Sequence, residues 1–341
     1  MISPAAPRVT ISDVARAAGV SATTVSHALN GRGQVDQRTR ERVLKAAAAL
    51  RYRPNRHAQR LRTGEAHMIV LLSSMPFAVA AGPSRLGFLM EIASVAAVAA
   101  LSKGLALVLA PPMESGHLPL DSLDVDGALI VEPTAHDANI EYMNRRGLAV
   151  VSIGRQPQVS NPIPHVDLRS ADTARLLLRH LREQGAKRIA LLIGSERRNS
   201  YLETEEVYRS FAAEFDMTAI VVTADESQGE AGGREATRNL LQRHPGVDGI
   251  CVPVDAFAIG TLGALRDAGL RVPDDVVVAT RYDGTRARTS QPLLTAVNLH
   301  LDFVAQQAVD LLIEHLRGEP ARQLVLGPAP ELVPRASSMR G

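Results

Sequence analysis

The apolar positions of the first fifty residues recur with the spacing of short helices. Thr10 and Asp13 form a start like a capping box, with Asp in place of the usual Glu or Gln, and Gly19 can take the positive φ that ends a helix. Ser21 and Asp36 are good N-caps for a second and a third helix. The predicted apolar stripes of the three helices are Ile11, Val14, Ala15 and Ala18, then Val25, Ala28 and Leu29, then Val43, Leu44, Ala47 and Leu50. Two short helices with a glycine-containing turn, closed by a third, predict a helix-turn-helix unit.

From about residue 66 the pattern changes to short apolar runs that alternate with helical segments. The predicted strands are Met68–Ser73, Leu105–Leu109, Gly127–Val131, Ala149–Ile153, Arg188–Ile193, Ala219–Val222, Gly249–Val252 and Val276–Ala279. The predicted helices cover about 86–102, 137–146, 171–184, 202–214, 229–243, 256–268 and 300–317. This alternation predicts parallel sheets with crossover helices, either as one large sheet or as two smaller ones.

Charge separates the two regions. Residues 1–62 hold twelve Lys and Arg against three Asp and Glu, a net charge of +9. The remaining residues hold 26 basic and 33 acidic side chains, a net charge of −7, so that the total of +2 is an average over unlike parts. A small basic segment on a mildly acidic body is typical of a nucleic-acid module joined to another domain.

The outward face of the second predicted helix favours DNA over solvent. Its residues are small or form hydrogen bonds: Ala22, Thr23, Ser26, His27 and Asn30. The alternative is a plain three-helix bundle with a solvated face, but such a face normally carries charge pairs, which are missing here. A slim face without carboxylates suits the major groove.

Composition excludes several classes of protein. Cys251 is the single cysteine, so an intramolecular disulfide and a cysteine-based zinc site are excluded and a reduced, cytosolic setting is expected. The first residues have no apolar h-region, and the apolar run 86–101 is interrupted by polar residues, so neither a signal peptide nor a membrane span is predicted. With 3% aromatic residues, base-stacking recognition of single strands is disfavoured.

Two motifs at the right separation identify a resemblance. The segment Val9–Gly64 contains VTISDVARAAGVSATTVSHALN, followed by YRPNRHAQRL, and is similar to the DNA-binding head of the LacI/GalR (lac repressor) family of bacterial transcription regulators. The match is strong over this head, and over the rest of the chain it rests on fold and on scattered motifs such as VDGALIV (125–131) and VSIGR (151–155).

The resemblance implies roles for residues of the head. Ala22 and Thr23 match the main base-reading positions, and His27 stands where the family usually has Arg. Arginine reads guanine through two hydrogen bonds, whereas histidine makes at most one good one, so the usual half-site is not carried over at that position. The positions that match phosphate contacts are Thr10, Ser21, Ser26, Asn30 and Thr39.

A hinge segment is implied over residues 54–63, between a DNA-binding domain at 1–53 and a body at 64–341. In the family this segment folds into a helix only on operator DNA and enters the minor groove, where a Leu matched here by Leu61 wedges between base pairs. The other minor-groove candidates are Asn55, Arg56 and Ala58. The alternative interpretation is a basic linker.

For the body, the resemblance implies two lobes like those of a type I periplasmic sugar-binding protein, with three crossings between them. Ligands of open α/β sheets bind beyond the carboxyl ends of strands. The candidate effector-binding residues are Ser73, Arg155, Tyr201, Asp255, Arg281 and Asp283. The alternatives are that Asp255 only caps a helix, and that Arg155 and Arg281 are solvated or form an interlobe salt bridge. Where effector-binding members carry an Arg, this chain has Val207.

These expectations combine into one function. The chain is expected to be a transcriptional regulator, a repressor, that binds a pseudo-palindromic operator in double-stranded DNA as a homodimer or a higher oligomer and responds to a small polar, sugar-like effector. The alternative is a cytosolic α/β metabolic enzyme, such as one like a sugar kinase, with an incidental basic head. No phosphate-binding loop, nucleophile elbow or zinc-binding HExxH motif occurs in the sequence, so no catalysis, cofactor or metal is predicted. A transport binding protein would require a signal peptide.

Overall fold

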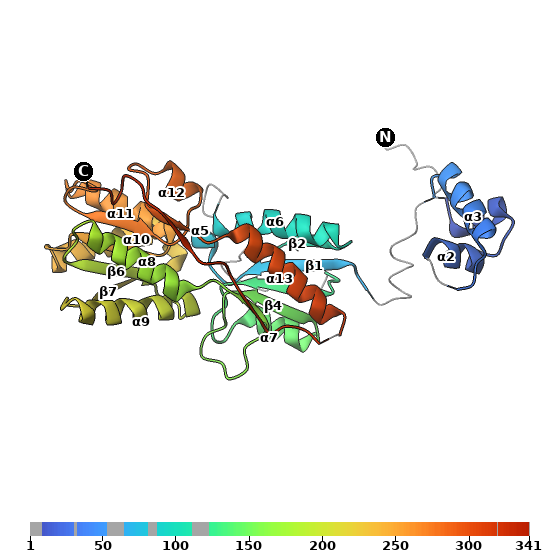
Figure 1. Cartoon of the computed structure of the whole chain (residues 1–341), viewed down its shortest axis with the longest axis horizontal. Helices are drawn as coiled ribbons and strands as arrows, with labels where there is room; N and C mark the ends of the chain where they lie inside the picture. The colour runs from blue at the N-terminus through green and yellow to red at the C-terminus, as the bar shows by residue number, and fades with distance from the viewer. Residues whose placement is uncertain are drawn as a thin grey trace. The chain divides into compact units, whose positions relative to one another are not determined.

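The chain forms two compact units, Met1–Ala66 and His67–Gly341 (Figure 1). The computed structural model describes residues 9–30, 33–52, 65–80, 87–110, 123–318 and 320–340. The predicted hinge residues Asn55, Arg56, Ala58 and Leu61 lie outside the described residues.

The first unit is a three-helix domain built on the caps that the sequence predicts. Its helices are α1 (Ile11–Ala18), α2 (Ala22–Asn30) and α3 (Gln37–Ala49). The backbone N–H of Thr10 donates to the Asp13 carboxylate at 2.9 Å, and Gly19 ends α1 with φ 66°. Valines from the three helices meet in the core with no exposed surface: Val14, Val25 and Val43.

One predicted core position of the head is wrong. Leu44 is 49% exposed, whereas Val43 and Ala47 are buried. Positions 43 and 47 are four residues apart and share one helix face, and residue 44 lies about 100° around the helix from residue 43. The apolar stripe of α3 is therefore narrower than predicted.

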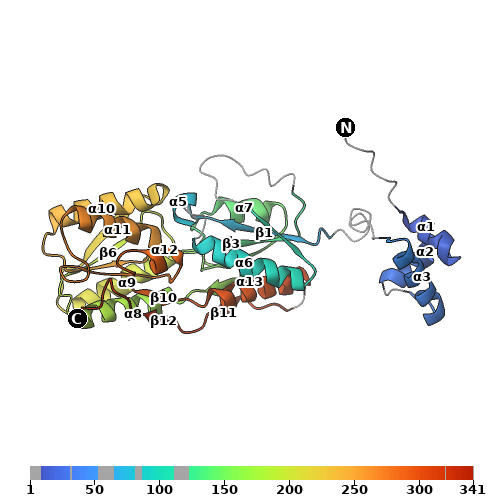
Figure 2. The same cartoon turned by 90° about the horizontal axis from the view of Figure 1, so that it is seen from above.

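The second unit begins with a lobe built on a six-stranded parallel sheet, in the order β11-β5-β4-β3-β1-β2. Its strands are β1 (Met68–Ser73), β2 (Ala106–Leu109), β3 (Gly127–Val131), β4 (Ala149–Ile153), β5 (His165–Asp167) and β11 (Leu324–Leu326). Helices α6 (Phe88–Ser102) and α13 (Leu301–Leu316) pack side by side on one face, and α7 (Ala138–Arg145) covers the other (Figure 2). A one-turn helix, α5 (Phe77–Ala80), follows β1.

A second lobe contains a four-stranded parallel sheet in the order β7-β6-β8-β9. Its strands are β6 (Ile189–Gly194), β7 (Ile220–Ala224), β8 (Gly249–Val252) and β9 (Val277–Thr280). Helices α8 (Ser170–Glu183) and α9 (Asn199–Glu214) lie on one face, and α10 (Gly229–Arg243) and α11 (Asp255–Asp267) lie on the other. The short elements are the 3₁₀ turn η2 (Glu226–Gln228) and α12 (Thr285–Thr289).

The chain crosses between the lobes three times: from β5 to α8, from β10 (Ala296–Asn298) to α13, and from β11 to β12 (Glu331–Val333). β10 and β12 pair antiparallel. The predicted fold class, a helix-turn-helix head with a two-lobed α/β body, is confirmed. All eight predicted strands occur, shifted by two residues at most. The four strands that the pattern misses have three residues each, too short to show a periodicity.

Three further observations on the described residues concern membrane-spanning helices, metal sites and the single cysteine. No described helix has the length and apolar character needed to cross a membrane. Among the same residues, no three His, Cys, Asp or Glu side chains form a group that could hold a metal ion. Cys251 is fully buried in β8, and burial raises the pKa of its thiol to about 12, so it behaves as a core residue.

Candidate DNA-binding face and interlobe site

The N-terminus of α2 presents the predicted base-reading residues to solvent. Ala22 and Thr23 are exposed, and both are in the first turn of the helix. Just before them, Ser21 caps the helix: its Oγ accepts a hydrogen bond from the backbone N–H of Thr24 at 3.0 Å. The cap satisfies a backbone N–H at the start of the helix and so stabilises the turn that carries Ala22 and Thr23. Helix-turn-helix proteins place base-contacting side chains on such a turn.

His27 is half-buried one turn further along α2. A Cβ added to Gly33 would lie 2.6 Å from its Nδ1, so the imidazole packs against the backbone of residue 33. Gly33 has φ +70°, which favours glycine as well. Gly33 therefore makes room for the His27 side chain of α2.

The predicted phosphate-contacting residues occupy different positions along the three helices of the head. Thr10 is exposed before α1, Thr39 is half-buried in the first turn of α3, and Ser26 is half-buried in α2. Asn30 is the last residue of α2, and its side chain lies outside the described residues.

Both aspartates of the head serve as caps. The side chain of Thr10 lowers the pKa of Asp13, and the backbone N–H of Thr39 lowers the pKa of Asp36. Their negative charges are thus held at helix N-termini, where they interact favourably with the helix dipole.

In the second unit, a buried arginine connects the two lobes. Arg198 precedes α9 and is 1% exposed. Its Nε donates to Glu226 Oε1 at 3.0 Å and its Nη2 to Glu226 Oε2 at 2.7 Å, both within the second lobe. The same guanidinium donates across the junction, through Nη2 to the carbonyl oxygen of Ser74 at 2.8 Å and through Nη1 to the carbonyl oxygen of Glu132. Those carbonyls directly follow β1 and β3.

A second set of contacts crosses the junction at Glu132. This residue follows β3 with φ 51°, and its buried carboxylate accepts from Arg281 Nη2 at 2.8 Å and from Ser200 Oγ at 2.7 Å. The guanidinium carbon of Arg281 also lies 5.7 Å from the ring centroid of Phe88, in the first lobe. Of the alternatives for Arg281, the interlobe salt bridge is therefore the arrangement found.

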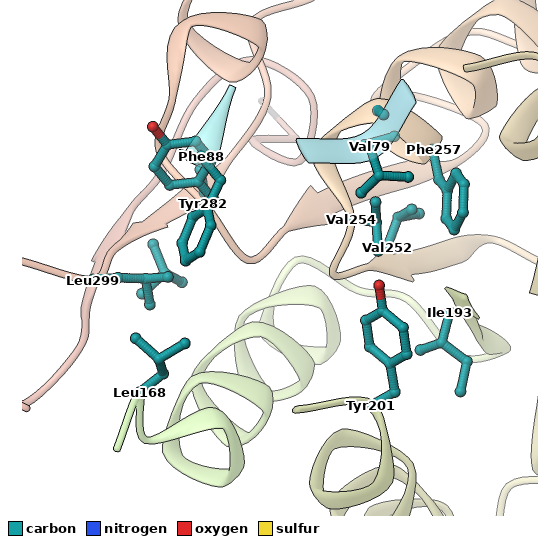
Figure 3. Close-up of a cluster of buried hydrophobic side chains, with 14 of the residues drawn as sticks. Val79, Phe88, Leu168, Ile193, Tyr201, Val252, Val254, Phe257, Tyr282 and Leu299 are labelled. Carbon is teal, nitrogen blue, oxygen red and sulfur yellow. The ribbon is translucent and has the colours of Figure 1, made fainter. Parts of the chain in front are cut away.

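Tyr201 lies beside this network, among Ile193, Val252 and Val254 (Figure 3). Burial raises the pKa of its hydroxyl well above the usual value, and the negative charge of Glu226 raises it further. Gly194 permits the packing, because a Cβ there would lie 2.5 Å from Glu226 Oε1 and 2.6 Å from Tyr201 Cε2.

Asp255 forms a third buried contact near the junction. It begins α11 and pairs with Arg286 Nη1 at 3.2 Å. Burial raises the pKa of the Asp255 carboxyl, and the charge of Arg286 offsets part of that effect. Arg286 also reaches the first lobe, where Nη1 donates to the carbonyl oxygen of Val79 at 3.4 Å.

The remaining candidates are dispersed. Asp283 binds Arg335 Nη2 at 2.6 Å and Arg288 Nη2 at 3.2 Å. Ser73 is buried at the end of β1 and accepts from the backbone N–H of Met75 at 3.1 Å. Arg155 is exposed and takes no part in the contacts of Arg198 and Glu132 described above.

Sequence reasoning missed four residues of this junction: Glu132, Arg198, Glu226 and Arg286. The signal was present for two of them, since Glu132 directly follows β3 and Glu226 lies two residues beyond β7. Val207 is the position where effector-binding members of the family carry an Arg. Val207 lines an outer groove of about 410 Å³ between α8 and α9, whereas Ser200 and Tyr201 face the junction.

The head and the body each match a known family of domains. Residues 10–55 match the family of bacterial regulatory proteins of the lacI type, and residues 178–338 match the periplasmic binding protein-like domain. The HTH-type transcriptional regulator CelR of Thermobifida fusca is 30% identical over 321 residues, which cover 92% of this chain and 93% of that protein. The chain belongs to the LacI family. It is a DNA-binding transcriptional regulator.

Other members of the LacI family match this chain over at least 91% of its length. The Ribose operon repressor of Halalkalibacterium halodurans is 31% identical and covers 91% of each chain. The lac repressor dimer bound to operator and the anti-inducer ONPF has a TM-score of 0.77 at 25% identity, covering 98% of this chain and 100% of that one. A complex of the regulator CelR with cellobiose has a TM-score of 0.69 at 28% identity, covering 97% and 100%. These relatives are all named as regulators or repressors.

Proposed function

We propose that this LacI-family regulator is a repressor that binds a pseudo-palindromic operator as a homodimer or a higher oligomer and is controlled by a small polar, sugar-like molecule between its lobes. The observation that carries the DNA-binding part is the exposed first turn of α2. It presents Ala22 and Thr23 on a turn capped by Ser21, with no carboxylate among the outward residues of the helix. Because the operator is DNA, we expect the protein to act in the cytoplasm, at the nucleoid.

In this proposal the head divides its contacts between bases and backbone. Ala22, Thr23 and His27 read base edges in the major groove, with His27 limited to one good hydrogen bond. The phosphate contacts are Thr10, Ser21, Ser26, Asn30 and Thr39. The hinge residues that enter the minor groove are Asn55, Arg56, Ala58 and Leu61.

For the effector, the lobe junction supplies the polar groups. Arg281, Tyr201 and Asp255 are all buried there, and the hydroxyl of Tyr201 and two nitrogens of Arg281 have no hydrogen-bond partner among the described residues. Ser73, Arg155 and Asp283 complete the proposed set. Relatives that bind cellobiose and ONPG support a sugar-like effector.

An apolar face on the first lobe supports the homodimer. Val98 and Leu101 project from α6 with 71% and 72% of their surfaces exposed, and Phe303 is exposed on the adjacent α13. Large exposed apolar groups on neighbouring helices favour contact with another protein surface. A second copy of the chain is the proposed partner, as in the lac repressor dimer.

Thr23→Ala and Thr39→Ala separate base reading from phosphate contact. Affinity is measured for the operator and for variants of each half-site base. Thr23→Ala should flatten the preference at one half-site position, a loss of about 1–3 kcal/mol of discrimination, because base contacts specify sequence. Thr39→Ala, the control, should weaken binding to all sequences alike, because phosphate contacts do not. An equal loss on every sequence with Thr23→Ala would refute its base-reading role.

A further inference from the structure

Among the described residues, the side-chain hydrogen bonds between the lobes run in one direction. Donors come from the second lobe, namely Arg198, Ser200, Arg281 and Arg286, and the acceptors belong to the first. Two of the acceptors are the carbonyl oxygens of Ser74 and Glu132, at the carboxyl ends of β1 and β3. In an open α/β sheet these ends are where a ligand binds. The guanidinium of Arg198 therefore forms its hydrogen bonds from the region beyond the carboxyl ends of β1 and β3, where a ligand would be expected to bind.

Burial makes each charged partner of this arrangement depend on the other. Arg198, Glu132 and Arg281 have at most 6% of their surfaces exposed. Burial by itself would lower the pKa of Arg198, but the hydrogen bonds and charge of Glu226 outweigh it and raise the pKa, so the guanidinium stays charged. Removing either partner of a buried charged pair leaves the other uncompensated. Separation of the lobes would expose both sides of these contacts to water at once.

Apolar and backbone contacts reinforce the same junction. Thr134 of the first lobe forms an antiparallel bridge with Arg198. Phe88 lies edge-on to Tyr282, with 5.3 Å between ring centroids. On the opposite side, a Cβ on Gly229 would lie 2.9 Å from that of Ala78, so α5 of the first lobe packs closely against the start of α10. The lobes therefore also meet through backbone and apolar contacts on either side of the buried arginines.

We propose that Arg198 and Arg281 act as an internal ligand, a latch that holds the two lobes together through the acceptors of the first lobe. This proposal rests on the proposed function in one respect, because it takes the junction between the lobes as the effector site. Its consequence is that an effector does not close an open body; it enters a body that is already held closed, and it must replace Arg281 at Glu132. A molecule that binds better to the separated lobes would weaken the latch by its difference in affinity for the two states.

Hydrogen exchange on the full chain tests the latch. The protein is refolded from denaturant, so that no small molecule is carried over, and exchange is followed by mass spectrometry in peptides that contain Thr134 and Arg198. Wild type should exchange slowly there. Arg281→Met should speed exchange in both peptides about tenfold or more, the effect of losing a charged buried hydrogen bond. Its radius of gyration in X-ray scattering should also rise.

Control variants keep the result interpretable. Arg234→Met removes an exposed ion pair with Asp267 inside the second lobe and should change neither readout. Ser200→Ala is a milder second test, because it removes one hydrogen bond to Glu132. Peptides from β6 and β8 report whether each variant is folded.

The latch is refuted if wild type already exchanges fast at these peptides, or if Arg281→Met and Ser200→Ala both leave exchange and radius unchanged. Operator affinity of the same wild-type sample without effector is measured separately. Slow exchange without sequence-specific DNA binding would refute the proposed function but not the latch. Fast exchange with sequence-specific DNA binding would refute the latch but not the proposed function.

Discussion

Gly194 shows how one missing side chain sets the geometry between the lobes. It ends β6, and a Cβ added there would lie 2.5 Å from Glu226 Oε1 and 2.6 Å from Tyr201 Cε2. Glu226 in turn orients Arg198, which reaches the first lobe. A single added Cβ would therefore disturb Glu226 and Tyr201 directly and Arg198 through Glu226.

Gly194→Ala should lower the free energy of unfolding by about 1–3 kcal/mol, because the added atom overlaps Glu226 and Tyr201 in a close-packed interior. Thermal or urea unfolding measures the change. The matched control is Gly263→Ala, where the nearest heavy atom to an added Cβ is 3.7 Å away and the residue is inside α11. That variant should be neutral or slightly stabilising, since Ala has the higher helix propensity. Equal losses in both would contradict the overlap.

His180 is a buried titratable residue of α8. Its Nε2 lies 2.6 Å from Ser338 Oγ, and Ser338 has no exposed surface. Burial lowers the pKa of this histidine, and the negative charge of Glu183 offsets part of the shift. The unfolded chain therefore binds a proton more readily than the folded one below about pH 6.5.

Because of that difference, the free energy of unfolding of wild type should fall as the pH drops from about 7.5 to about 5.5, and His180→Asn should show a shallower fall. Urea unfolding at several pH values measures both slopes. His136→Asn, at an exposed position, serves as the control and should keep the wild-type slope. Identical slopes for wild type and His180→Asn would contradict the lowered pKa.

At the scale of elements, helix α6 has two unlike faces. Ile92, Ala96 and Ala100 are fully buried against the sheet, while Val98 and Leu101 project outward. An outward face of a solvated helix normally carries charged residues. The exposed apolar pair therefore has a role outside the packing of its own lobe.

Leu101→Glu should convert the proposed dimer to monomer, because a buried, unpaired carboxylate at an interface costs several kcal/mol. Analytical ultracentrifugation over a range of concentrations measures the change. Leu293→Glu replaces another exposed leucine, 43% accessible and in the second lobe, and should leave the dimer intact. If Leu101→Glu dimerises as well as wild type, α6 does not form the interface.

The sequence predicted elements better than it predicted contacts. Helix α10 and strand β3 were placed with their observed ends, because each depends on residues within a few positions of one another. The prediction that Leu44 belongs to the core is wrong, because an apolar residue beside a stripe does not reveal which helices pack against it. The position of Arg281 directly after a strand identifies it as a candidate site residue, but no local pattern identifies its partner Glu132.

At the scale of the molecule, the chain divides into two units that differ in net charge and in function. The units Met1–Ala66 and His67–Gly341 each have a core of their own. The basic residues of 1–62 belong to the DNA-binding head, and the body is acidic overall. Each unit is thus expected to fold by itself.

Removal of residues 1–66 should abolish DNA binding and leave a body that melts cooperatively and keeps its oligomeric state. Scanning calorimetry and ultracentrifugation measure both properties, with the full chain as reference. The expectation follows from a core that contains none of the removed residues and from apolar groups on α6 that stay in the fragment. A monomeric fragment would move the dimer interface into the head or hinge.

The sequence by itself determined the fold class, the caps of the head, most strands and the division of charge. Those features depend on residues close together in the chain, through periodicity, side-chain capping and propensity. Only the tertiary structure decided that Arg281 meets Glu132, 149 positions away, and that Arg198 reaches the carbonyls of Ser74 and Glu132. Such pairs depend on how two sheets face each other, which local pattern does not encode.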